Sequence, residues 1–91
     1  MKQTSGRHFF ASGRVQGVFY RKFCRNEAQK LGLTGWAKNL NDGRVEVIVY
    51  GDDESLAFYE KKLQSGPILS KVTSLSKKTI PFEVYEGFDI Y

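Results

Sequence analysis

The chain has 91 residues, which is enough for one small hydrophobic core and too short for two, so we expect residues 1–91 to form a single domain. Its formal net charge of +4 favours anionic partners, such as phosphorylated metabolites, nucleic acid or acidic surfaces, without choosing among them. One cysteine excludes an internal disulfide and a cysteine-rich zinc site.

The first elements along the chain are a strand and a helix. Residues 1–6 are polar, and we expect them to be flexible. The apolar run after them predicts a strand over residues 8–13, but it is too short for a signal sequence or a membrane span, so we expect a cytoplasmic protein. Apolar residues at helical spacing predict a helix over residues 19–31, which Gly32 would end as a C-cap glycine.

A β-hairpin follows the first helix. Residues 33–40 and 44–50 have the composition of strands, and Asn41, Asp42 and Gly43 between them form a turn signal. The second of these strands alternates in a way that predicts one preferred buried face, formed by Val45, Val47 and Val49. We therefore expect the two strands to pair antiparallel.

The second half of the chain predicts another helix and further strands. Acidic residues at 52–54 suit the start of a helix, and Gly66 with Pro67 would stop it. Its predicted apolar stripe consists of Leu56, Tyr59 and Leu63. Residues 72–80 alternate weakly and predict a fourth strand, while residues 82–91 hold one or two short extended segments.

The element order is βαββαβ with an extra terminal strand, which is the α+β split βαβ arrangement. We expect an antiparallel sheet with both helices on one face. A right-handed crossover makes the first two strands parallel, with the third between them, so their carboxyl ends lie about 10 Å apart at one edge. Asn39, near the end of the second strand, can then point its amide toward the turn that follows the first strand; alternatively, it serves the hairpin turn.

This turn, residues 13–21, has the composition of an anion-binding segment. Gly13 and Gly17 permit positive φ and close approach to a ligand, and the helix start behind them leaves amide N–H groups free. Arg21 falls in the first helical turn, where a guanidinium can bind two oxygens of the same anion. The turn lacks the ending of a nucleotide P-loop, and such an arginine can also be a solvated surface residue, so the spacing alone leaves the question open.

Three sequence motifs resemble the acylphosphatase family. They are Gly13-Arg14-Val15-Gln16-Gly17-Val18-Phe19-Tyr20-Arg21, then Gly35-Trp36-Ala37-Lys38-Asn39, then Asp42-Gly43-Arg44-Val45-Glu46-Val47. The resemblance is dense over residues 8–51 and weaker afterwards, and residues 70–82 match poorly. It implies a ferredoxin-like fold and hydrolysis of acyl phosphates.

The resemblance also implies roles for individual residues. Arg21 would bind the phosphate as a catalytic residue, and Asn39 would orient the attacking water. The other expected substrate-binding residues act through the main chain of the turn and are Val15, Gln16, Gly17, Val18, Phe19 and Tyr20. We expect no metal and no cofactor, an acyl phosphate as substrate, inorganic phosphate as product and competing ligand, and a monomer.

Two other classes of function remain as alternatives. A basic ferredoxin-like domain can bind nucleic acid, but the RNA-recognition signature is absent from the third strand, so we do not expect this partner. A phosphate-sensing regulatory domain would not need Asn39 to place water. Cys24 and His8 are expected to have structural roles, and no other residue is an obvious covalent nucleophile.

Overall fold

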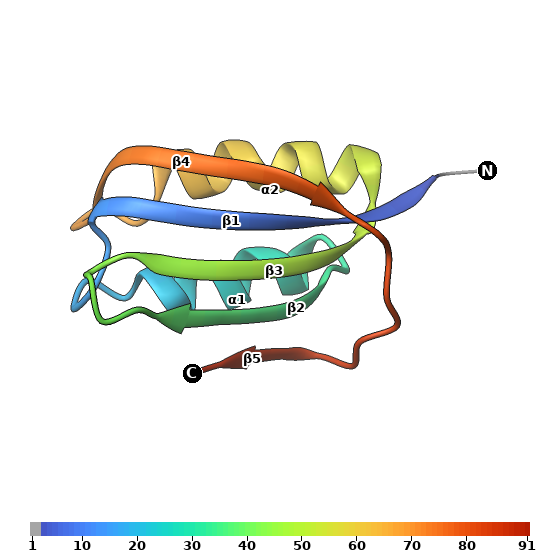
Figure 1. The fold of residues 1–91 in the computed structure, drawn as a ribbon, viewed down its shortest axis with the longest axis horizontal. Coiled ribbons are helices and arrows are strands. Elements are labelled where there is room, and N and C mark those ends of the chain that lie inside the picture. Colours follow the sequence, from blue (N-terminus) through green and yellow to red (C-terminus); the bar gives the residue numbers. More distant parts are fainter. Residues whose placement is uncertain (1–2) are drawn as a thin grey trace.

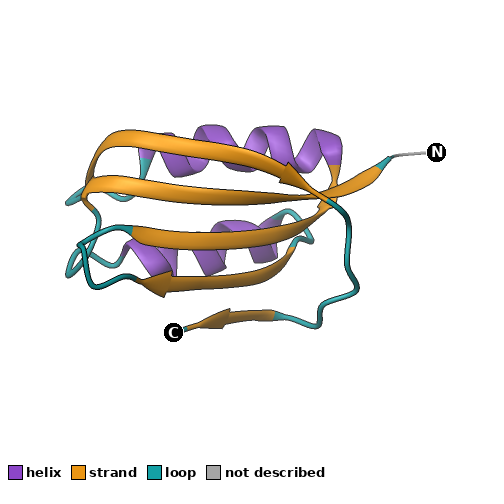
Figure 2. Cartoon of the chain, viewed as in Figure 1, coloured by secondary structure: helices purple, strands orange, loops and turns teal. Residues whose placement is uncertain are grey.

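The computed structural model describes residues 3–91, which form five strands and two helices (Figure 2). In chain order these elements are β1 (Thr4–Arg14), α1 (Tyr20–Lys30), β2 (Thr34–Asn39), β3 (Val45–Asp52), α2 (Asp53–Ser65), β4 (Lys71–Ile80) and β5 (Phe88–Ile90). The predicted βαββαβ order with one short terminal strand is confirmed.

The strands form one sheet in the order β4-β1-β3-β2-β5, and both helices lie behind it in Figure 1. Neighbouring strands are antiparallel, except that β5 pairs in parallel with β2. Our expectation of a wholly antiparallel sheet is therefore wrong for the terminal strand. The segment between β4 and β5 carries the chain from one edge of the sheet to the other, and β5 then runs in the direction of β2 (Figure 1).

The central position of β3 brings the ends of β1 and β2 to the same side of the molecule. Both strands pair antiparallel with β3, so they are parallel to each other, as predicted. The loop that follows β1 and the hairpin turn that follows β2 consequently lie at one end of the sheet (Figure 1).

The core lies between the sheet and the two helices. The predicted face of β3, Val45, Val47 and Val49, is fully buried, and so is the predicted stripe of α2, Leu56, Tyr59 and Leu63. Cys24 of α1 is also buried, and its main-chain oxygen accepts a hydrogen bond from the Tyr59 hydroxyl at 2.8 Å. Cys24 thus lies in the core, as expected, where burial raises the pKa of its thiol and favours the protonated form.

The opposite face of β3 is also covered at one end, which the alternation did not predict. Ile48 and Tyr50 are 8% and 7% exposed. The ring of Tyr50 packs against Phe82 and Tyr85 from the segment that connects β4 to β5, and its hydroxyl donates to Glu83 at 3.2 Å. A segment more than 30 positions away in the sequence thus buries a face that the strand pattern alone leaves exposed.

Most element boundaries agree with the sequence, and the largest difference is at the start of β1. The strand begins at Thr4, four residues before the predicted start, and residues 4–7 pair with residues 49–52 of β3. Residues 1 and 2, part of the segment expected to be flexible, lie outside the described residues. Among the residues that the structure describes, no helix is long and apolar enough to cross a membrane.

Candidate active site

The loop of residues 15–19, which connects β1 to α1, has an unusual backbone. Gly17 has φ of 73° and Phe19 has φ of 64°. Left-handed backbone costs a residue other than glycine about 1–2 kcal/mol, so Phe19 holds a strained conformation. Phe19 is also the N-cap of α1 and makes no capping hydrogen bond through its side chain. The amide N–H groups at the start of α1 therefore receive no hydrogen-bond acceptor from the N-cap side chain.

Several amide N–H groups are consequently available at this point. The first main-chain hydrogen bond of α1 runs from Phe23 N to Phe19 O at 3.0 Å, so the preceding amides have no helical acceptor. Within residues 3–91, the amides of residues 16–19 also donate to no main-chain oxygen. Because these donors lie at the positive end of the helix dipole, the loop can bind an anion such as a phosphoryl group.

The two glycines of the predicted turn have different environments. Gly13 lies in β1 with φ of 115°, where a Cβ atom would meet the main-chain oxygen of Lys71 at 2.1 Å. The register between β1 and β4 shifts at this residue. Gly17 has open space around the position of a Cβ. Gly13 thus serves the packing of β1 against β4, where we had expected it to approach a ligand.

Alanine substitutions should separate these two glycines. Gly13→Ala should lower the free energy of unfolding by about 2–4 kcal/mol, because it adds a backbone clash to a left-handed conformation. Gly17→Ala should cost only about 1–2 kcal/mol but should weaken phosphate binding by distorting the loop. Urea denaturation and calorimetric titration with phosphate measure both effects. Equal losses of stability, or unchanged phosphate affinity in Gly17→Ala, would contradict this assignment.

Two side chains of the loop anchor it to the rest of the fold. Val15 is 1% exposed and belongs to the core. Gln16 donates from Nε2 to the main-chain oxygens of Leu40 at 2.8 Å and Arg44 at 2.9 Å. Because Leu40 follows directly after Asn39, the Gln16 side chain fixes the loop beside the end of β2. Only the main chain of Gln16 can then take part in the predicted anion binding.

Tyr20 fixes the start of α1 in the same way. Its ring is 1% exposed, and its hydroxyl donates to the main-chain oxygen of Leu63 in α2 at 2.7 Å. Burial raises the pKa of this phenol, so it stays protonated as a hydrogen-bond donor. The next residue, Arg21, is half-buried.

Arg21 and Asn39 meet at a single oxygen atom. Arg21 Nη1 donates to the main-chain oxygen of Tyr91 at 2.6 Å, and the main-chain N–H of Asn39 makes a long contact with the same oxygen, 3.5 Å. Residues separated by 18 positions in the sequence are therefore neighbours in the structure. Tyr91, which follows β5, contacts both residues, and no signal in the sequence indicated this contact.

The Asn39 side chain has an unused hydrogen-bonding group. It lies on the same face of β2 as the buried residue Ala37, which is the face that the helices cover. Its Oδ1 atom is buried and has no hydrogen-bond partner among the described residues. Buried acceptors are nearly always paired, so this atom is suited to a donor from outside the chain, such as a water molecule.

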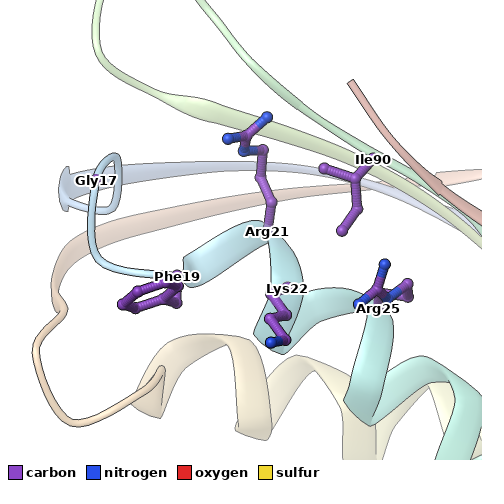
Figure 3. Close-up of a pocket in the computed structure, with 6 residues that line it drawn as sticks. All are labelled: Gly17, Phe19, Arg21, Lys22, Arg25 and Ile90. Atoms are coloured by element: carbon purple, nitrogen blue, oxygen red, sulfur yellow. The ribbon is translucent and has the colours of Figure 1, made fainter.

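A pocket of about 430 Å³ lies against the start of α1 (Figure 3). Gly17, Phe19 and Arg21 of the predicted site line it, together with Lys22, Arg25 and Ile90. Its lining thus contains three basic side chains and no acidic one. Arg25 was not predicted, although its spacing of four residues from Arg21 places both on one helix face and could have indicated it. Asn39 does not line this pocket.

Metal-ligating residues do not gather at this site. Within residues 3–91, no group of three or more His, Cys, Asp and Glu side chains could hold a metal ion. His8 instead pairs with Glu46 of the neighbouring strand at 2.7 Å, in agreement with a structural role. These features are those of a small ferredoxin-like α+β protein with a loop of unpaired amide groups beside a basic pocket.

Comparison with known proteins agrees with this class. The acylphosphatase family matches residues 7–90. An acylphosphatase from Alkalilimnicola ehrlichii is 42% identical over 87 residues, which cover 96% of this chain and 98% of that protein. Solved acylphosphatases from Coxiella burnetii and Bacillus subtilis superpose with TM-scores of 0.92 and 0.93, each at 36% identity. The matches cover 97% and 96% of this chain, and 93% and 98% of theirs. The chain belongs to the acylphosphatase family.

Proposed function

We propose that this protein hydrolyses the carboxyl–phosphate bond of acyl phosphates, giving a carboxylate and inorganic phosphate by direct in-line attack of water. The observation that carries the proposal is that Arg21 reaches the end of β2, where its guanidinium and the main-chain N–H of Asn39 contact the same oxygen of Tyr91, beside a loop with free amide groups. One set of groups can bind the phosphoryl oxygens while another holds water.

The reaction needs few chemical groups. A carboxylate leaves readily at neutral pH without being protonated, so a strong general acid is unnecessary. What remains is to neutralise charge on the phosphoryl oxygens and to place water in line with the phosphorus atom. The chain's own donors are sufficient for both tasks, and the proposed reaction uses no metal and no cofactor.

Arg21 and the loop amides take the first task. A guanidinium has five N–H donors, and only Nη1 of Arg21 donates to Tyr91, so the other donors can bind phosphoryl oxygens. The contact with Tyr91 also restricts the rotation of this long side chain. Arg21 lines the same pocket as Gly17 and Phe19, so the amides of residues 16–19 would bind the remaining oxygens of the same group.

Asn39 takes the second task. Its unpaired Oδ1 atom can accept a hydrogen bond from the attacking water, which orients an oxygen lone pair of the water toward the phosphorus atom. The hydrogen bonds from Gln16 hold the end of β2 beside the loop, so the water and the phosphoryl group would be bound by adjacent parts of the chain.

Hydrolysis of benzoyl phosphate tests the proposal. The purified protein should hydrolyse it at the same rate with a metal chelator present, and inorganic phosphate should inhibit competitively, because it binds where the phosphoryl group binds. Loss of turnover on chelation would contradict the metal-free mechanism. Phosphate binding without any turnover would instead indicate a ligand sensor and would overturn the proposed function.

A further inference from the structure

The basic side chains at the start of α1 exceed what one phosphoryl group needs. Arg21 and the loop amides suffice for that group, yet Lys22 and Arg25 line the same pocket. In Figure 3 the side chains of Arg21 and Arg25 lie on either side of Ile90, while Lys22 extends in another direction. The pocket therefore has a second basic region beyond the phosphoryl site.

Neither of these two cations is neutralised by the protein. Over the described range 3–91, ion pairs form at Arg7, His8, Lys30, Arg44 and Lys77, and none includes Lys22 or Arg25. Arg25 also lies four residues after Arg21, and like charges at this spacing destabilise a helix. Because these cations have no acidic partner in the described protein and Arg25 reduces helix stability, they are suited to bind an anion from solution.

The position of the pocket relative to Asn39 indicates which part of a substrate it would hold. In-line attack places the water and the leaving group on opposite sides of the phosphorus atom. Asn39, the residue proposed to orient water, is not part of the pocket lining. The pocket along α1 is therefore free of the group proposed to hold water and has room for the acyl group, with Phe19 and Ile90 as its apolar lining.

We propose, on the basis of the proposed function, that Arg25 binds a second anionic group on the acyl part of the substrate, with Lys22 adding positive charge to the same pocket. The preferred substrates are then acyl phosphates that carry a carboxylate or a further phosphate a few atoms from the reacting carbonyl. The helix sets this separation: Arg25 lies about 6 Å along the axis from Arg21, at about 1.5 Å per residue.

Three substrates with the same reacting group provide the test. They are benzoyl phosphate, its para-carboxylate derivative and its para-carboxamide derivative, which has nearly the same shape without the charge. Steady-state kcat/KM is measured for each with the wild type, Lys22→Gln, Arg25→Gln and Arg25→Lys. Lys61→Gln is the matched control, because it removes an exposed helix cation that lies outside the pocket and forms no ion pair with the described residues.

The carboxylate-to-carboxamide ratio of kcat/KM is the quantity to compare, because it cancels differences in folding and in active enzyme concentration. Arg25→Gln should lower the ratio about threefold to tenfold, and Lys22→Gln should lower it less. The change should appear mainly in KM, since a group remote from the phosphorus binds equally in the ground and transition states. Arg25→Lys should retain most of the preference, and Lys61→Gln should leave the ratio unchanged.

Three results would overturn the inference. An unchanged ratio in both Lys22→Gln and Arg25→Gln would show that these residues do not contact the acyl group. An equal change in Lys61→Gln would show only a general attraction of anions by the basic protein. In both cases, hydrolysis of benzoyl phosphate would leave the proposed function intact. No turnover of any of the three substrates by the wild type would overturn the proposed function and this inference together.

Discussion

Arg21→Ala should lower kcat/KM for benzoyl phosphate by about 100- to 1000-fold, the usual effect of removing one well-placed electrostatic donor. The same change should abolish measurable binding of inorganic phosphate, because Arg21 is the charged residue of the proposed phosphoryl site. The hydrogen bond from Arg21 to Tyr91 is exposed, so its removal should lower the free energy of unfolding by only about 1 kcal/mol or less. Kinetics, calorimetric titration with phosphate and urea denaturation measure the three quantities.

Arg21→Lys is the control that separates the effect of the positive charge from the effect of the guanidinium geometry. Lysine keeps the positive charge, but its three donors lie on one nitrogen atom and lack the planar fork with which a guanidinium binds two phosphoryl oxygens. We expect it to recover part of the phosphate affinity and little of the turnover. Full activity in Arg21→Lys would mean that charge alone is needed, and normal phosphate binding in Arg21→Ala would remove Arg21 from the site.

Asn39→Ala should lower turnover as Arg21→Ala does, but it should spare phosphate binding. It should lower kcat by about 100- to 1000-fold, because water loses the group that orients it, while the dissociation constant for phosphate stays nearly unchanged. The free energy of unfolding should also change little, because the substitution removes a buried oxygen that has no partner among the described residues. A loss of activity without a loss of affinity or stability would distinguish Asn39 from a residue of the hairpin turn.

Asn39→Asp serves as the matched control for Asn39→Ala. The carboxylate can still accept a hydrogen bond from water, but it places a negative charge beside a bound phosphoryl group. We expect weaker phosphate binding in Asn39→Asp than in the wild type, with some turnover retained at low pH. Equal losses of phosphate affinity in Asn39→Ala and Arg21→Ala would contradict the division of roles between the two residues.

The element order and most boundaries could be predicted because their signals are local. Apolar residues at helical spacing predicted α2 with its buried stripe of Leu56, Tyr59 and Leu63. The turn signal of Asn41, Asp42 and Gly43 predicted the hairpin, in which Leu40 N donates to Arg44 O at 2.8 Å. Each of these features depends on residues close together in sequence, and the tertiary structure does not oppose them.

The candidate site could be predicted only in part. The glycine turn and Arg21 followed from spacing, and the resemblance to the family added Asn39. The sequence did not show that Gly13 packs against Lys71 or that the Gln16 side chain ties the loop to the hairpin. It also did not show that Arg21 contacts Tyr91, which is 70 positions later in the chain.

Local patterns in the sequence were sufficient for the helices, four of the strands and the position of the glycine turn between β1 and α1. Three other features depend on the assembled fold: the parallel pairing of β5, the burial of Tyr50 by residues 82 and 85, and the joining of Arg25 and Ile90 in one pocket. Periodicity shows which face of an element is apolar, but not which distant segment covers it. That choice depends on packing across the whole core, which no single stretch of sequence contains.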